Sequence, residues 1–167
     1  MNEKAATLAP AVPDQLAEDA WQLLSRACEQ ELKLATAESC TGGMLASLLT
    51  DVKGVAHAFE RGFVTYSSEA KTELLGVAPD MIASKGAVSR EVAIAMAEGA
   101  LERSRADIAL GVTGFADMGE EPGLVHLACA RAGRATAHRE AHFGNRGRGE
   151  VRIAALEAAV RMMTEML

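Results

Sequence analysis

The chain has 167 residues, of which 49% are hydrophobic and 24% are charged. This length and apolar content suit one globular domain with a full core and leave no room for a second one. The net charge is −6, which argues against a protein that covers nucleic acid or an anionic membrane surface. The three cysteines are odd in number and widely spaced, so we expect no disulfide framework and a reducing, cytoplasmic setting.

The N-terminal residues, 1–12, contain no sustained apolar core and are predicted to form a loose tail before a single domain at 13–167. No segment approaches the length of a membrane span. Asp14 can cap a first helix, with Trp21 packing beside its apolar face, which consists of Leu16, Ala20, Leu23 and Ala27.

Strands and helices then alternate along the chain. Apolar and β-branched runs predict strands at 32–37, 59–66 and 107–113, followed by a hairpin formed by 124–131 and 134–143. Helical spacing and capping residues predict helices at 41–50, 69–75, 89–103 and 150–167, and a loop at 115–122. This order predicts an α/β fold, a three-layer α/β/α sandwich with a mixed, mostly parallel sheet.

The stretch 34–45 carries the first strand into the second helix through small polar residues and a glycine pair. Ser39 or Thr41 can cap this helix, and Gly42 and Gly43 allow a ligand to approach the backbone. The helix N-terminus favours a phosphate, a carboxylate or an oxyanion. A plain capped helix with a tight turn explains the same residues equally well.

Hydroxyl groups follow each of the first three predicted strands: Ser39, Tyr66, and Thr113 with Gly114. Parallel strands would bring these ends to one edge of the sheet, where α/β proteins bind ligands. Lys71 is a candidate base for a serine nucleophile if its pKa falls from about 10.4 to between about 7 and 8. On the residues alone, an ordinary surface lysine is the more common outcome.

The segment 143–152 contains three arginines and three glycines and runs into the last helix. Arginine there suits bidentate binding of phosphate or carboxylate, whereas a solvated linker is the alternative. His138 and His142 lack acidic or thiolate partners at ligand spacing, so we expect no metal and no cofactor. Cys40 is a second possible nucleophile, although small buried cysteines are usually inert.

Several motifs succeed one another in a specific order: 37–43, 59–67 running into 69–71, 86–89, 112–114, 123–125, and Arg148 with 151–152. Together they resemble the C-terminal domain of the CinA family, which in bacteria acts as a nicotinamide-mononucleotide deamidase. The resemblance covers nearly the whole chain from Asp14. Larger members add an N-terminal domain similar to molybdopterin-binding proteins, so this chain is expected to be the stand-alone form.

The resemblance implies an oligomeric cytoplasmic amidohydrolase of pyridine-nucleotide (NAD) salvage that releases ammonia and nicotinate mononucleotide. It assigns Ser39 as the nucleophile, Lys71 as its base, and Tyr66 to the surrounding shell. The predicted substrate-binding residues are Thr41, Gly42, Gly43, Thr113, Gly114 and Arg148. The amides of 40–43 could hold either the oxyanion or the phosphate, and both assignments stay open.

The loop after Thr113 and Gly114 departs from the family pattern, because it is shorter, lacks a lysine and contains Asp117, Glu120 and Glu121. Its carboxylates predict weaker binding of an anionic nucleotide. The alternative function is therefore a non-catalytic nucleotide-sensing or interaction domain that keeps the pocket without turnover.

Overall fold

The computed structural model describes residues 12–167, so the predicted tail lies outside the described residues except for Val12. Five strands form one sheet in the order β2-β1-β3-β4-β5. β1 pairs in parallel with β2 and β3, whereas β3 with β4 and β4 with β5 pair antiparallel, which confirms the mixed sheet. The strands are β1 (Leu34–Glu38), β2 (Phe59–Val64), β3 (Ile108–Gly114), β4 (Leu124–Arg131) and β5 (Ala137–His142).

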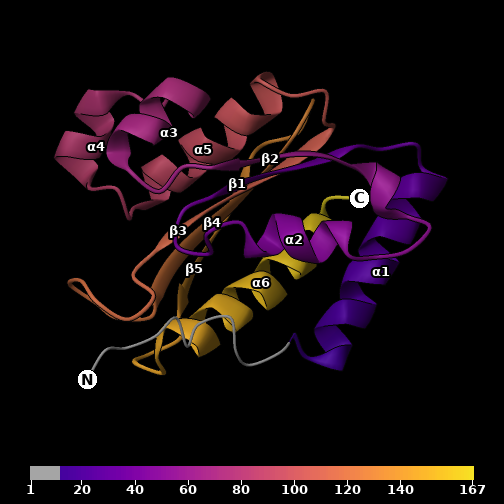
Figure 1. Ribbon diagram of the computed structural model, residues 1–167. Helices are drawn as coiled ribbons and strands as arrows, with labels where there is room; N and C mark the ends of the chain where they lie inside the picture. Colours follow the sequence, from indigo (N-terminus) through magenta and orange to yellow (C-terminus); the bar gives the residue numbers. More distant parts are fainter. Residues whose placement is uncertain (1–11) are drawn as a thin grey trace.

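Helices cover both faces of the sheet, which confirms the three layers (Figure 1). One face carries α3 (Ser68–Leu75), α4 (Pro79–Lys85) and α5 (Arg90–Glu102). The other face carries α1 (Asp14–Glu29), α2 (Met44–Thr50) and α6 (Arg148–Glu165). A short 3-10 turn, η2 (Ala56–Ala58), leads into β2.

The two faces of the central strands differ in side-chain size. Large apolar residues of β1, β3 and β4 pack against α1, α2 and α6, among them Leu34, Leu110 and Leu127. Small residues such as Ala35 and Ala109 face α5. Gly111 lets α5 approach most closely, because a Cβ atom there would lie 2.6 Å from the Ala93 carbonyl oxygen. This tight packing fixes the parallel strands whose ends carry the candidate site.

Local signals placed most helix starts correctly. Ser67 caps α3 by accepting a hydrogen bond from the Ala70 N–H (3.1 Å), and Ser89 caps α5 through the Val92 N–H (3.3 Å). Gly76, in the left-handed conformation, follows α3, whose last residue, Leu75, is also the last of the predicted helix. The helix α4, which begins with proline at its first position, was not expected from the sequence.

Three expectations about side chains are wrong. Asp14 does not cap α1: it is the first residue of the helix, the N-cap position is Pro13, and no side chain makes a capping hydrogen bond there. Trp21 is 47% exposed, because the buried face of α1 is formed by Leu16, Leu23 and their neighbours. The helix α2 begins at Met44 and has no capping hydrogen bond from Ser39 or Thr41.

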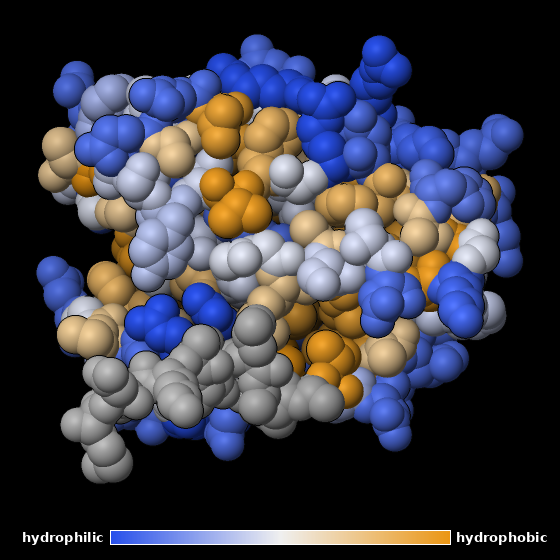
Figure 2. Space-filling view, in the orientation of Figure 1, coloured by the Kyte–Doolittle hydropathy of each residue, from blue (hydrophilic) through white to orange (hydrophobic). Residues whose placement is uncertain are grey.

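In Figure 2, hydrophilic residues dominate the margin of the visible face, and apolar groups form small patches between them. Among residues 12–167, no helix combines the length and the apolar character that a membrane crossing requires.

Candidate active site

The ends of β1, β2 and β3 meet at one edge of the sheet, as the sequence predicts. Beyond β1, the N–H of Ser39 still donates to the carbonyl of Val112 (3.0 Å), and the N–H of Thr65 donates to that of Glu38 (2.8 Å). These bonds hold the corner after β1 in line with its neighbours. A cavity of about 380 Å³ opens at this edge, and its lining includes Ser39, Tyr66, Lys71, Thr113, Gly114 and Arg148.

Ser39 and Lys71 are in direct contact. The Nζ atom of Lys71 lies 3.0 Å from Ser39 Oγ and donates to the carbonyls of Thr65 (2.9 Å) and Tyr66 (3.4 Å). Lys71 is 1% exposed and Ser39 is 7% exposed, so the surface-lysine alternative is wrong. Burial lowers the pKa of Lys71 below the usual 10.5. A neutral amine at this distance can accept the Ser39 proton.

A buried carboxylate organises the turn that follows Ser39. Glu38 is fully buried, and its Oε2 accepts hydrogen bonds from the Thr41 hydroxyl (2.7 Å) and the N–H groups of Gly43 (3.1 Å) and Leu45 (3.0 Å). Its Oε1 accepts from the Ala46 N–H (2.8 Å). The chain's own carboxylate therefore occupies the N-terminus of α2, which excludes phosphate binding at these amides.

The predicted ligand contacts Thr41, Gly42 and Gly43 do not line the cavity. The N–H of Gly42 donates to the Ser39 carbonyl (3.1 Å), and both glycines have φ values, 61° and 92°, that favour glycine. Turn geometry therefore accounts for the glycine pair. These residues form the turn that follows Ser39.

One peptide at the corner is held from the far end of the chain. Arg152 Nε donates to the Cys40 carbonyl oxygen (2.7 Å). Because the peptide is trans, the Thr41 N–H points opposite to that carbonyl. Within the described part of the chain, the N–H groups of Cys40 and Thr41 have no hydrogen-bond acceptor on another residue. No local pattern points to this role of Arg152, since the contact spans more than one hundred residues.

Cys40 does not suit the role of nucleophile. Burial raises the pKa of its thiol to about 12, so the reactive thiolate is scarce near neutral pH. Its side chain lines the cavity beside Ser39, but the lysine hydrogen bond is to the serine.

The predicted ligand contact Arg148 lies in the cavity, where an acidic partner already binds it. Its Nε and Nη2 atoms bind Asp117 Oδ2 (3.0 Å) and Oδ1 (2.5 Å) in a bidentate pair. Glu120 and Glu121 do not line the cavity, and Glu121 instead binds His142 Nδ1 (2.6 Å). Of the acidic loop, only Asp117 reaches the site.

The remaining predicted residues have different surroundings. The Thr113 hydroxyl donates to the Ala87 carbonyl (2.8 Å) and so ties the segment before α5 to the sheet. Tyr66 is largely exposed at the cavity's mouth. His138 stacks on His126, and no group of three or more His, Cys, Asp or Glu side chains among residues 12–167 is placed to hold a metal ion.

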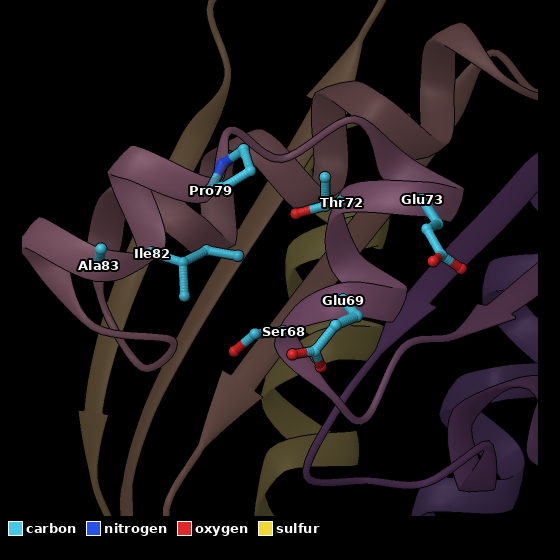
Figure 3. Close-up of a pocket in the computed structure, with 7 residues that line it drawn as sticks. All are labelled: Ser68, Glu69, Thr72, Glu73, Pro79, Ile82 and Ala83. Atoms are coloured by element: carbon cyan, nitrogen blue, oxygen red, sulfur yellow. The ribbon is translucent and has the colours of Figure 1, made fainter.

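A second cavity, of about 350 Å³, lies between α3 and α4 (Figure 3). Its α3 side carries Glu69, Thr72 and Glu73, and the Ile82 side chain extends from α4 toward it. Its described lining residues contain no lysine, histidine or cysteine to activate a nucleophile. The contact between Ser39 and Lys71 makes the cavity at the sheet edge the candidate active site.

Comparison with known proteins agrees with this fold. The family described as the CinA C-terminal domain matches residues 15–167. The chain belongs to this family. A CinA-like protein of Akkermansia muciniphila is 54% identical over 113 residues, which are 65% of this chain and 27% of the relative. The chain thus matches about a quarter to a third of the length of several CinA-like relatives.

A shorter CinA-family relative is similar over most of its own length. The nicotinamide-nucleotide amidohydrolase PncC of Escherichia coli K12 is 47% identical over 119 residues, 68% of this chain and 72% of that protein. Among solved structures, a competence/damage-inducible protein of Agrobacterium tumefaciens superposes with a TM-score of 0.90 at 40% identity, covering 94% of this chain and 98% of that one. A CinA superfamily protein from E. coli superposes at 0.85 with 31% identity, covering 100% and 99% of the two chains.

Proposed function

We propose that this chain is an amidohydrolase that cleaves the carboxamide of nicotinamide mononucleotide to give nicotinate mononucleotide and ammonia. The observation that carries the proposal is the 3.0 Å contact between Ser39 Oγ and Lys71 Nζ inside a buried cavity. The similarity to a relative named nicotinamide-nucleotide amidohydrolase supports the choice of substrate class.

In the proposed mechanism, Ser39 Oγ attacks the carboxamide carbon while Lys71 takes the serine proton. The tetrahedral intermediate carries a negative oxygen, for which the N–H groups of Cys40 and Thr41 are the available donors. Lys71 then returns the proton to the amide nitrogen, which leaves as ammonia and creates an ester on Ser39. Water, deprotonated by Lys71, hydrolyses this ester and releases the carboxylate product with free serine.

Burial of Lys71 among uncharged partners supports this role. Its Nζ is bound by one hydroxyl and two backbone carbonyls, and no carboxylate is among its partners in the described part of the chain. Burial without an anionic partner disfavours the ammonium form, so the amine needed as a base becomes accessible at lower pH.

The second candidate is a nucleotide-sensing domain that binds without turnover. It is favoured by the Asp117–Arg148 ion pair. A guanidinium that already binds a carboxylate has fewer N–H donors left to hold a substrate's phosphate. Ligand binding without ammonia release would select this function.

The test is ammonia release from nicotinamide mononucleotide by the wild type, Ser39→Ala, Lys71→Met and the double variant. Each single variant is expected to lose activity by about 1,000-fold or more. The double variant should be about as active as the less active of the two single variants, because nucleophile and base act as a unit. Ser47→Ala and Lys53→Met are matched controls on exposed positions. Normal turnover by folded Ser39→Ala would refute the nucleophile assignment.

A further inference from the structure

The guanidinium that faces the cavity is bound by a carboxylate of the same chain. Arg148, the first residue of α6, binds Asp117 from the loop between β3 and β4. Both side chains line the cavity and are partly open to solvent, at 29% and 31% exposure. A carboxylate in this bidentate arrangement uses the same two N–H donors that a phosphate would use.

The charges that line the cavity are few. Among its lining residues in the described chain, Lys71 and Arg148 are the basic ones and Asp117 is the acidic one. If Lys71 serves as a neutral base, Arg148 is the remaining cation, and Asp117 compensates its charge. The cavity then carries no net positive charge to attract a phosphate.

We propose that Asp117 is a specificity-determining residue that competes with the substrate's phosphate for Arg148. It thereby shifts the preference of the site from a pyridinium nucleotide toward the corresponding nucleoside, which has no phosphate. This inference rests on the proposed amidohydrolase function, because it concerns the substrate of the same site.

The charges of the two substrates explain the direction of the shift. A phosphate monoester adds a charge of about −1.5 to −2 near neutral pH. The nucleotide must therefore displace Asp117 from Arg148 or accept a carboxylate close to its phosphate. The nucleoside carries only the positive pyridinium ring, leaves the ion pair intact and experiences no repulsion from Asp117.

The rest of the loop provides a control for this argument. Its base is closed by hydrogen bonds from the Phe115 N–H to the Leu124 carbonyl (2.9 Å) and from the Gly123 N–H to the Phe115 carbonyl (2.7 Å). Glu120 lies on the same loop, is exposed and does not line the cavity. Glu120→Gln therefore removes one charge from the loop and leaves the ion pair in place.

The experiment compares kcat/KM for nicotinamide mononucleotide and nicotinamide riboside. Asp117→Asn should raise the nucleotide-to-nucleoside ratio about tenfold, since one nearby carboxylate charge is removed. Glu120→Gln should change the ratio less than about twofold. In an Arg148→Ala background, Asp117→Asn should change the ratio much less, because only the repulsion by the carboxylate is then removed and no guanidinium is set free for the phosphate. An unchanged ratio in Asp117→Asn, an equal change in Glu120→Gln, or an equally large effect without Arg148 would overturn the inference.

A binding measurement separates this inference from the proposed function. If no variant releases ammonia from either compound, the amidohydrolase assignment fails, and calorimetric titration with the same two compounds then decides the inference. About tenfold tighter binding of the nucleotide, but not the nucleoside, to Asp117→Asn supports the competition for Arg148. Equal nucleotide affinity in the two proteins, or no binding to either, overturns it.

Discussion

Replacing Glu38 by Gln tests how the corner after β1 is held together. The side chains are nearly isosteric, but the carboxylate offers two acceptor oxygens and the amide only one. Glu38 accepts hydrogen bonds from three N–H groups, of Gly43, Leu45 and Ala46, and from two hydroxyl groups, of Thr41 and Thr36. All five groups donate to the carboxylate, and both of its oxygens are used. The NH2 group of Gln must therefore stand where one of these oxygens now accepts a hydrogen bond.

The least damaging placement of the amide keeps its oxygen at the Oε2 position, which has three donors. Its NH2 group then faces the Ala46 N–H across the present 2.8 Å contact, and two donors meet. The change removes one hydrogen bond to a charged group, worth about 1.5–3 kcal/mol, and leaves a partly buried donor unsatisfied at about 1–3 kcal/mol. Since Ala46 is only partly buried, we expect Glu38→Gln to lower the free energy of unfolding by about 2–4 kcal/mol.

Urea unfolding followed by circular dichroism measures this loss. Glu69→Gln is the matched control, because Glu69 is an exposed first-turn glutamate of α3 with no comparable set of donors. Its loss should stay below about 1 kcal/mol, the usual size of a helix-dipole interaction. If Glu38→Gln and Glu69→Gln lower the free energy of unfolding by the same amount, the carboxylate of Glu38 does not organise the corner and our account of it is wrong.

Two further predictions concern titratable groups near the site. Because burial lowers the pKa of Lys71 and the base must be unprotonated, kcat/KM should rise with pH through a midpoint below 10.5 and then level off; a midpoint at or above 10.5 would contradict the assignment. Burial raises the pKa of Cys40 and Cys129 to about 12, so iodoacetamide at pH 8 should alkylate the half-buried Cys28 alone in the folded protein, as mass spectrometry can establish. Alkylation of Cys40 under these conditions would restore it as a possible nucleophile.

The elements that could be predicted from the sequence depend on interactions between residues a few positions apart in the chain. Ser67 and Ser89 cap helices through N–H groups three residues ahead, and the apolar spacing of α1 specifies which side it buries. The meeting of Ser39, Tyr66 and Thr113 also followed from a local pattern, since parallel strands of an α/β fold end at the same edge. These parts of the site required no knowledge of how the layers pack.

Other features were decided by contacts between distant segments. Residue statistics favoured an exposed Lys71, but the position of α3, which packs against α5 and α4, buries it against Ser39. Thr41 seemed a suitable cap for α2, but the carboxylate of Glu38, turned to that face of the sheet by strand alternation, takes the cap position instead.

The same holds for the partner of Arg148. The basic segment indicated an anion, and the tertiary structure supplies one from within the chain, Asp117, which is 31 residues away. The sequence by itself determined which groups were available: a serine, a lysine, an arginine and an acidic loop. Only the packing of the three layers decided which of these groups meet, because burial, hydrogen bonding and charge compensation depend on distances in space that no local spacing specifies.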